Sequence, residues 1–204
     1  MDIDRVSHHQ LSYSDFIFNY AIPRKPVIIQ GLNLTKEEWT LDFIKRKCGS
    51  KNVDAQKRES NSVEWGSLHA VERMSVEEFI DTHTTNQTRR SFYLHDWSLP
   101  IRCPEVFGSP PYDAFVMPKY FVNDYFQKLP FESYQHSWPS LFIGASGTQS
   151  DMHIDSGGTH FWMYLLSGRK EWRIYPQSDR KFLYETPGVE HWEYDPFQQH
   201  HQHH

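Results

Sequence analysis

The chain has 204 residues, enough for one domain with a substantial core but not comfortably for two. Its formal net charge of −5 argues against a protein that holds nucleic acid by bulk electrostatics. The mean hydropathy is −0.72, no apolar run has the length of a membrane span, and the polar, acidic N-terminal stretch is not expected to act as a signal peptide. Aromatic residues make up 16% of the chain and can fill a core that the aliphatic residues would leave thin.

The two cysteines, Cys48 and Cys103, lie far apart and outside any CxxC pattern. Without a secretion signal, we expect them to be reduced thiols of an intracellular protein. The histidine-rich end, "HHQHH", has the composition of a low-complexity tail, and we do not expect a specific metal site there.

Helices alternate with a short strand in the first half of the chain. The capping and breaker residues predict helices at residues 14–20, with Ser14 as N-cap, at 35–49, with Thr35 as N-cap, and at 75–83. The β-branched run "VIIQ" predicts a strand that Gly31 ends.

Strands dominate the second half. Residues 90–97 are strand-like, and a proline-rich loop and a short predicted helix, 119–129, follow them. Further strands are predicted at 140–147, 152–155, 159–168 and 170–176, with a tight hairpin turn at Gly168. This order predicts a mainly β fold with helical decoration, a double-stranded β-helix or jelly roll. A jelly roll usually has eight strands, and the pattern supplies only five or six, so the barrel is expected to be unfinished at residue 204.

The motif "HID" contains the first candidate site residues, His153 and Asp155. On a strand, this spacing points both side chains to one face. An imidazole and a carboxylate there suit a divalent metal, such as the iron of a two-histidine, one-carboxylate triad. The alternative, a solvated polar turn, remains open on these two residues alone.

Three further residues could bind a carboxylate that also chelates the metal. Lys170 follows the predicted hairpin, and a lysine that points into a barrel needs an anion. The hydroxyls of Ser150 and Tyr93 could donate to the same carboxylate. The alternatives are a surface lysine for Lys170, a turn residue for Ser150 and core packing for Tyr93.

Three stretches together resemble the jumonji-C (JmjC) domains, which are iron and 2-oxoglutarate oxygenases of the cupin superfamily. They are "HIDSGGTHFW…GRKEWRIYP", "MPKYFVNDYFQ" and "FYLHDW", and "FIFNYAIPRKPVIIQGL" is similar to the usual start of such domains. The likeness is greatest to the lysyl hydroxylase type once called the phosphatidylserine receptor.

The resemblance implies a site and an activity. His153 and Asp155 would ligate Fe(II), while Lys170, Ser150 and Tyr93 would bind the co-substrate 2-oxoglutarate. With molecular oxygen, the enzyme would hydroxylate or demethylate a protein side chain, on lysine, arginine or another residue. The family also implies an intracellular location, nuclear or cytoplasmic.

The second metal histidine of the family has no match in this sequence. His191 follows "TPGVE", but no strand leads into it, and His160 has the features of a core or loop histidine. We therefore expect a JmjC or cupin-like domain at residues 1–176, with a helical and strand entry at 1–90 and barrel strands at 91–176. Residues 177–204 would be an irregular tail at a truncation point. The alternative function is a catalytically inactive cupin-like binding module or a fragment without a complete metal triad.

Overall fold

The computed structural model describes residues 2–59, 65–84, 92–108, 114–128 and 137–183, which form two compact units. The first unit comprises residues 1–47 and 98–140, and the second comprises residues 48–97 and 141–204. No helix of the described residues is both long and apolar enough to cross a membrane.

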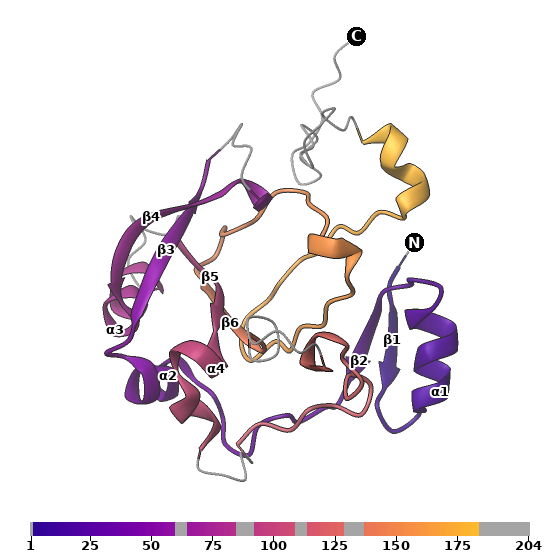
Figure 1. Ribbon diagram of the computed structural model, residues 1–204, viewed down its shortest axis with the longest axis horizontal. Coiled ribbons are helices and arrows are strands. Elements are labelled where there is room, and N and C mark those ends of the chain that lie inside the picture. Colours follow the sequence, from indigo (N-terminus) through magenta and orange to yellow (C-terminus); the bar gives the residue numbers. More distant parts are fainter. Residues whose placement is uncertain (1, 60–64, 85–91, 109–113, 129–136, 184–204) are drawn as a thin grey trace. The chain divides into compact units, whose positions relative to one another are not determined.

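A two-stranded parallel sheet and short helices make up the first unit (Figure 1). Strand β1 (Asp4–Ser7) pairs with β2 (Val27–Gln30), and helix α1 (Tyr13–Phe16) connects them, continued by a π-helical turn, Ile17–Ala21. Helix α2 (Leu41–Cys48) begins in this unit, and α4 (Leu99–Arg102) returns to it. The strand predicted at "VIIQ" is therefore confirmed.

Aromatic rings and one buried hydroxyl hold the first unit together. Trp39 stacks on Phe43 with ring centroids 5.6 Å apart, and it also contacts Phe107 and Phe115. The hydroxyl of buried Tyr120 donates to the carbonyl of Leu11 at 3.0 Å. The aromatic content thus supplies much of this core, as the composition suggested.

The second unit contains a four-stranded sheet in the order β4-β3-β5-β6 (Figure 1). Its strands are β3 (Asn52–Arg58), β4 (Leu68–Ser75), β5 (Phe92–Ser98) and β6 (Ser140–Gly144). Strand β3 pairs antiparallel with both β4 and β5. Helix α3 (Val76–Phe79) follows β4 and buries Val76 and Phe79.

The sheet places four polar side chains on one face. Gln56 of β3 pairs with Tyr93 of β5, so these two side chains project to the same side. Since side chains two residues apart on a strand share a face, Arg58 and His95 project to that side as well.

Some predicted elements are wrong. Residues 159–168 and 170–176 form no strands in the structure, and residues 152–155 are not a strand either. The described residues contain antiparallel strands but no closed jelly roll. A strand needs a partner ladder in addition to β-forming residues, and here apolar side chains with the period of a strand, such as Phe161, Met163 and Leu165, remain exposed.

Two helix predictions also need correction. Thr35 forms an isolated bridge with Phe115, and α2 begins only after Thr40, whose hydroxyl accepts from the backbone N–H of Phe43. Within the described part of residues 119–129, only a 3₁₀ turn, Phe126–Lys128, is helical.

The cysteine prediction is wrong as well. Cys48 and Cys103 are fully buried, and both are disulfide-bonded rather than reduced. The prediction relied on the lack of a recognisable secretion signal and on the separation of the cysteines in the sequence, and neither limits which thiols form a disulfide in the folded chain.

Candidate metal and co-substrate site

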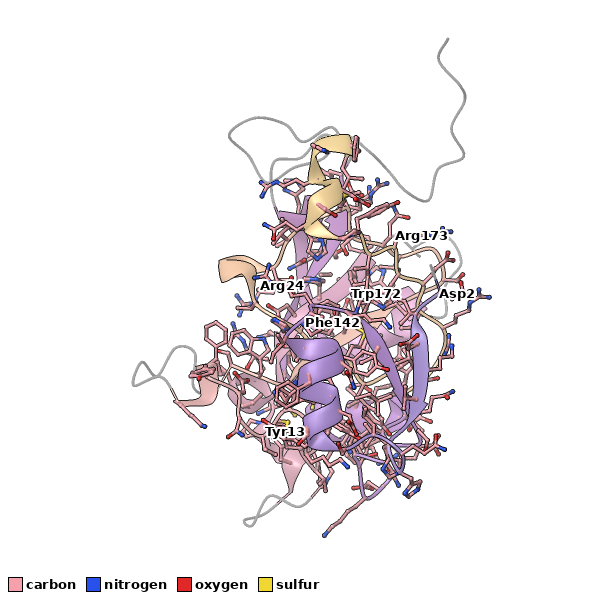
Figure 2. The ribbon with its side chains drawn as sticks, turned by 90° about the vertical axis from the view of Figure 1, so that its right-hand side faces the viewer. Asp2, Tyr13, Arg24, Phe142, Trp172 and Arg173 are labelled. Atoms are coloured by element: carbon pink, nitrogen blue, oxygen red, sulfur yellow. The ribbon has the colours of Figure 1, made fainter. Side chains whose placement is uncertain are left out.

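Lys170 and Tyr93 meet although 77 positions separate them in the sequence. The Lys170 ammonium donates to the Tyr93 hydroxyl at 3.2 Å. It also lies 4.6 Å from the ring centroid of Trp172 and 5.6 Å from that of Phe142, the two side chains labelled in Figure 2. The contacts with rings favour a cation and fix the position of the ammonium.

Burial changes the acid–base properties of this pair. It raises the pKa of Tyr93 to about 12, so the phenol stays neutral and keeps its proton for donation. Burial also lowers the pKa of Lys170, because a desolvated ammonium is less stable. An anionic ligand would restore that stability, so the pair is suited to bind a carboxylate.

His153 and Asp155 lie together on the loop that follows β6. The Nε2 atom of His153 is 3.8 Å from Oδ1 of Asp155. Two adjacent ligand atoms, each about 2.1 Å from one metal ion, would be roughly 3 Å apart, so a small movement would let both reach the same ion. The two side chains meet although the loop is not a strand.

Electrostatics at Asp155 agree with a cation site. Burial raises the pKa of its carboxyl, the neighbouring His153 lowers that pKa, and Asp96 raises it. A half-buried carboxylate of this kind is stabilised by a cation. The donor types, an imidazole nitrogen and a carboxylate oxygen, fit Fe(II) as two members of a facial triad.

A third ligand is not found in the part of the chain that the structure describes. There, no group of three His, Cys, Asp or Glu side chains could hold one metal ion. His160 is exposed, and His191 lies outside the described residues.

The third predicted co-substrate residue, Ser150, lies next to the Gly66 turn, which also approaches His153. A Cβ atom built on Gly66 would be 3.3 Å from the Cβ of Ser150 and 3.7 Å from Nδ1 of His153. In the described residues, the five predicted side chains thus form two bonded or closely spaced pairs, Lys170 with Tyr93 and His153 with Asp155, while Ser150 packs against Gly66.

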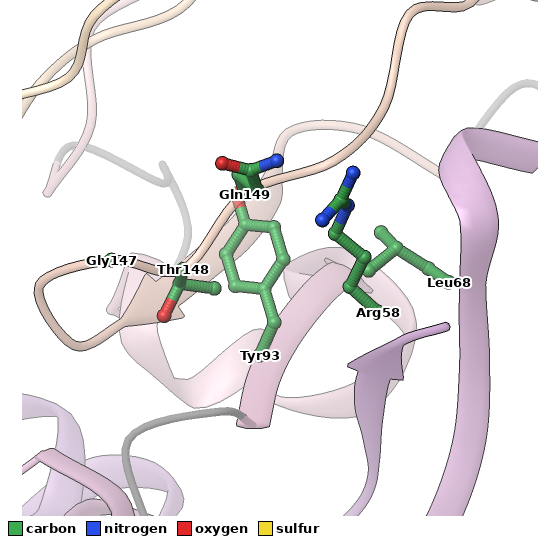
Figure 3. A pocket seen from close by; sticks show the side chains of 6 residues that line it. All are labelled: Arg58, Leu68, Tyr93, Gly147, Thr148 and Gln149. Atoms are coloured by element: carbon green, nitrogen blue, oxygen red, sulfur yellow. The ribbon is translucent and has the colours of Figure 1, made fainter. Parts of the chain in front are cut away.

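A cavity of about 170 Å³ opens next to Tyr93 (Figure 3). Six residues line it: Arg58, Leu68, Tyr93, Gly147, Thr148 and Gln149. Figure 3 shows the amide of Gln149 above the Tyr93 ring and the guanidinium of Arg58 beside it. This volume is several times the roughly 30 Å³ that one water occupies, so the cavity has room for more than a single water.

Sequence reasoning missed two polar residues near these pairs. Arg58 ends β3 and has no motif around it, and His95 follows Tyr93 on the same face of β5. Burial, against an opposing effect of Asp96 and with smaller contributions from Lys170 and His153, lowers the pKa of His95 to about 4. The period-2 rule applied to Tyr93 could have indicated His95, whereas nothing local indicates Arg58.

Comparison with known proteins decides the family. Residues 14–203 match the cupin-like domain family. The chain belongs to this family. The predicted resemblance to JmjC oxygenases is confirmed by its relatives, which include a bifunctional arginine demethylase and lysyl-hydroxylase, psr-1, of Caenorhabditis elegans, 30% identical over 85% of this chain.

Two other relatives point the same way. The arginine-specific demethylase JMJ22 of Arabidopsis thaliana is 28% identical over 81% of the chain, and the 2-oxoglutarate and iron-dependent oxygenase JMJD4 of Gallus gallus is 24% identical over 91%. The matches cover only 41%, 30% and 45% of these three relatives, so the cupin-like chain spans less than half the length of each.

Proposed function

We propose that this cupin-like chain is part of an Fe(II)- and 2-oxoglutarate-dependent oxygenase that hydroxylates or demethylates a protein side chain, with lysine and arginine as the first candidates. One observation carries the proposal: a histidine–carboxylate pair and a ring-enclosed lysine–tyrosine pair lie in the same compact unit. Relatives named as 2-oxoglutarate and iron-dependent oxygenases, arginine demethylases and a lysyl-hydroxylase support it.

Each residue has a distinct role in this proposal. His153 and Asp155 donate two ligand atoms to the metal. The Lys170 ammonium and the hydroxyls of Tyr93 and Ser150 bind the far carboxylate of 2-oxoglutarate. The iron and its co-substrate supply the oxidation of a C–H bond, while the protein binds, orients and excludes water. The same family resemblance suggests action in the nucleus or cytoplasm.

The test is an anaerobic titration of the chain with Fe(II) and 2-oxoglutarate, following the weak visible charge-transfer band of the bound chelate. We expect a saturable band in the wild type that is lost in His153→Ala and Lys170→Ala. His160→Ala and Lys181→Ala are matched controls, because His160 is exposed and Lys181 has its own ring contact, with Phe182 at 4.9 Å. Both controls should keep the band.

The second candidate is a cupin-like binding module without catalysis. It is favoured by the lack of a third His, Cys, Asp or Glu ligand within the described residues. A site with two protein ligands should bind iron weakly. No band at any Fe(II) concentration would support this module and contradict the oxygenase proposal for this chain.

A further inference from the structure

Asp151 connects three separate segments of the second unit. Its carboxylate accepts a hydrogen bond from Nε of Arg58, at the end of β3. Its backbone N–H donates to the carbonyl of Gly66 at 2.9 Å. Its own carbonyl accepts from Nδ1 of His153 at 2.6 Å. Arg58 on the sheet and Gly66 on the turn therefore fix the position of Asp151. The carbonyl of Asp151 in turn fixes the orientation of the His153 imidazole.

The contact with His153 determines which ring nitrogen carries hydrogen. A carbonyl oxygen can only accept, so Nδ1 must be the donor. In the neutral imidazole this makes Nε2 the nitrogen without hydrogen, and Nε2 lies 3.8 Å from Oδ1 of Asp155. Metal-binding histidines usually have such a partner for the second nitrogen, because it fixes the tautomer and the ring orientation.

The turn that contains Gly66 packs directly against this arrangement. Gly66 has a φ of +61°, a conformation that favours glycine, and an added Cβ would lie 3.3 Å from the Cβ of Ser150. The close approach leaves little room for the Asp151 loop to shift toward the turn. Arg58 restrains the same loop through its hydrogen bond to the Asp151 carboxylate.

The ion pair of Arg58 and Asp151 is suited to this restraint. The two side chains are 27% and 14% exposed, so the pair is shielded from water and less screened by salt than a surface pair. A charge-assisted hydrogen bond of this kind is stronger than a neutral one. Loss of either partner would leave a partly buried charge without its counter-ion, which is destabilising.

We propose that Arg58 is a positioning residue for His153, which it orients through Asp151 so that Nε2 faces Asp155. The inference rests on the proposed function only in treating His153 as a metal ligand. Arg58 acts through another residue and needs no contact with the metal or with 2-oxoglutarate.

The experiment compares Arg58→Gln with Arg73→Gln. Arg73 forms an ion pair in the same sheet, with its Nε 4.0 Å from Oδ1 of Asp54, but both side chains are more than half exposed. The first readout is the ¹⁵N chemical shifts of the His153 ring in the metal-free protein at alkaline pH, assigned with a His153→Gln variant. The second is the affinity for Co(II), measured by its visible absorption.

We expect wild type and Arg73→Gln to show one His153 tautomer, with hydrogen on Nδ1. Arg58→Gln should show a mixture of tautomers and bind Co(II) about 10-fold more weakly, the lower end of the effect for such partners. Asp151→Asn keeps an acceptor oxygen for Arg58 and should retain part of the affinity. Asp151→Ala should match Arg58→Gln, and the double variant should be no worse than either single one.

Three outcomes separate this inference from the proposed function. Unchanged tautomer and affinity in Arg58→Gln would overturn the positioning role. Weaker Co(II) binding with an unchanged tautomer would also overturn it, since Arg58 would then act by another route. A shifted tautomer in Arg58→Gln, together with Co(II) binding that survives in His153→Gln, would support the positioning role while contradicting His153 as a ligand.

Discussion

At the scale of single residues, the position of the Lys170 ammonium depends on Tyr93. The hydroxyl of Tyr93 accepts a hydrogen bond from the ammonium at 3.2 Å, whereas the rings of Phe142 and Trp172 give cation–π contacts. A neutral hydroxyl can accept a hydrogen bond from the Lys170 ammonium and donate one to a carboxylate. Tyr93 can therefore contact both the ammonium and a bound carboxylate.

Tyr93→Phe should therefore weaken 2-oxoglutarate binding about 5- to 10-fold, which corresponds to one hydrogen bond of roughly 1–1.5 kcal/mol. The fold should be retained, because the ring stays in place. Isothermal titration of the Fe(II)-loaded chain measures the effect. Tyr125→Phe, at a tyrosine that is 84% exposed, is the control, and equal affinities in both variants would contradict the role of Tyr93.

His95 should make the protein sensitive to acid. Burial, with contributions from Lys170 and His153, holds its pKa at about 4, below the ordinary value of 6.5, despite the opposing effect of Asp96. The unfolded chain then binds more protons than the folded one between these values. Stability should therefore fall as the pH drops from 6.5 toward 4, by up to roughly 3 kcal/mol.

Denaturant unfolding of wild type and His95→Phe across this pH range measures the effect. The phenyl ring keeps a ring next to Phe142, which His95 meets edge-on with centroids 5.0 Å apart, but it cannot bind a proton. The variant should lose part of the acid sensitivity. Identical pH dependence in both proteins would show that another group is responsible.

Two of the contacts among the candidate residues could be expected from sequence. His153 and Asp155 are two positions apart, and Tyr93 and Lys170 were named with an expected common ligand; the structure brings the members of each pair together. Arg58 and Asp151 could not be found in this way. They are 93 positions apart, and their pairing depends on how the loop after β6 returns to the end of β3.

At the scale of elements, the start of α1 depends on one serine. Ser12, rather than the predicted Ser14, is the N-cap: its hydroxyl accepts from the backbone N–H of Asp15 at 3.0 Å and donates to the Asp15 carboxylate at 2.6 Å. Both serines precede helix-forming residues, so sequence alone cannot say which of them is the N-cap.

Ser12→Ala should lower the free energy of unfolding by about 1 kcal/mol, because an N–H of the first turn loses its acceptor. Ser14→Ala should change it by less than about 0.5 kcal/mol, since Ser14 lies within the helix and is exposed. Urea denaturation of the two variants gives the comparison, and a larger loss in Ser14→Ala would contradict the assignment of the cap.

The other elements show the limit of local patterns. Strands β2, β5 and β6 follow from β-branched and aromatic runs that end at turns. The same kind of run at residues 159–168 forms no strand. Strand propensity measures how well a residue fits a pleated surface. It therefore predicts a strand only where a neighbouring strand is present to form the backbone hydrogen bonds.

At the scale of the whole molecule, ligand binding should appear as added stability. A ligand that binds only the folded chain, present at 100 times its dissociation constant, stabilises it by about 2.7 kcal/mol. For a chain of this size, that corresponds to a rise in Tm of about 5–10 °C. Fe(II) and 2-oxoglutarate together should therefore raise the Tm under anaerobic conditions, and a chelator should reverse the rise.

Lys170→Ala should abolish the part of this rise that needs 2-oxoglutarate, while the smaller effect of Fe(II) alone should remain. Differential scanning calorimetry resolves the two contributions. A full 2-oxoglutarate-dependent rise in Lys170→Ala would contradict its role as the carboxylate partner.

The large sequence separation between contacting residues predicts the order in which their contacts form during folding. Strands β3 and β4 are neighbours in sequence, whereas the Arg58–Asp151 and Tyr93–Lys170 contacts close loops of 93 and 77 residues. Local pairs cost less loop entropy and tend to form first. We expect pulse-labelled hydrogen exchange to find β3 and β4 protected before the N–H of Asp151, which bonds to Gly66. Simultaneous protection would contradict this order. During synthesis on the ribosome, β3 and β4 would leave the exit tunnel before Lys170, so the Tyr93–Lys170 contact would form only after these two strands could pair.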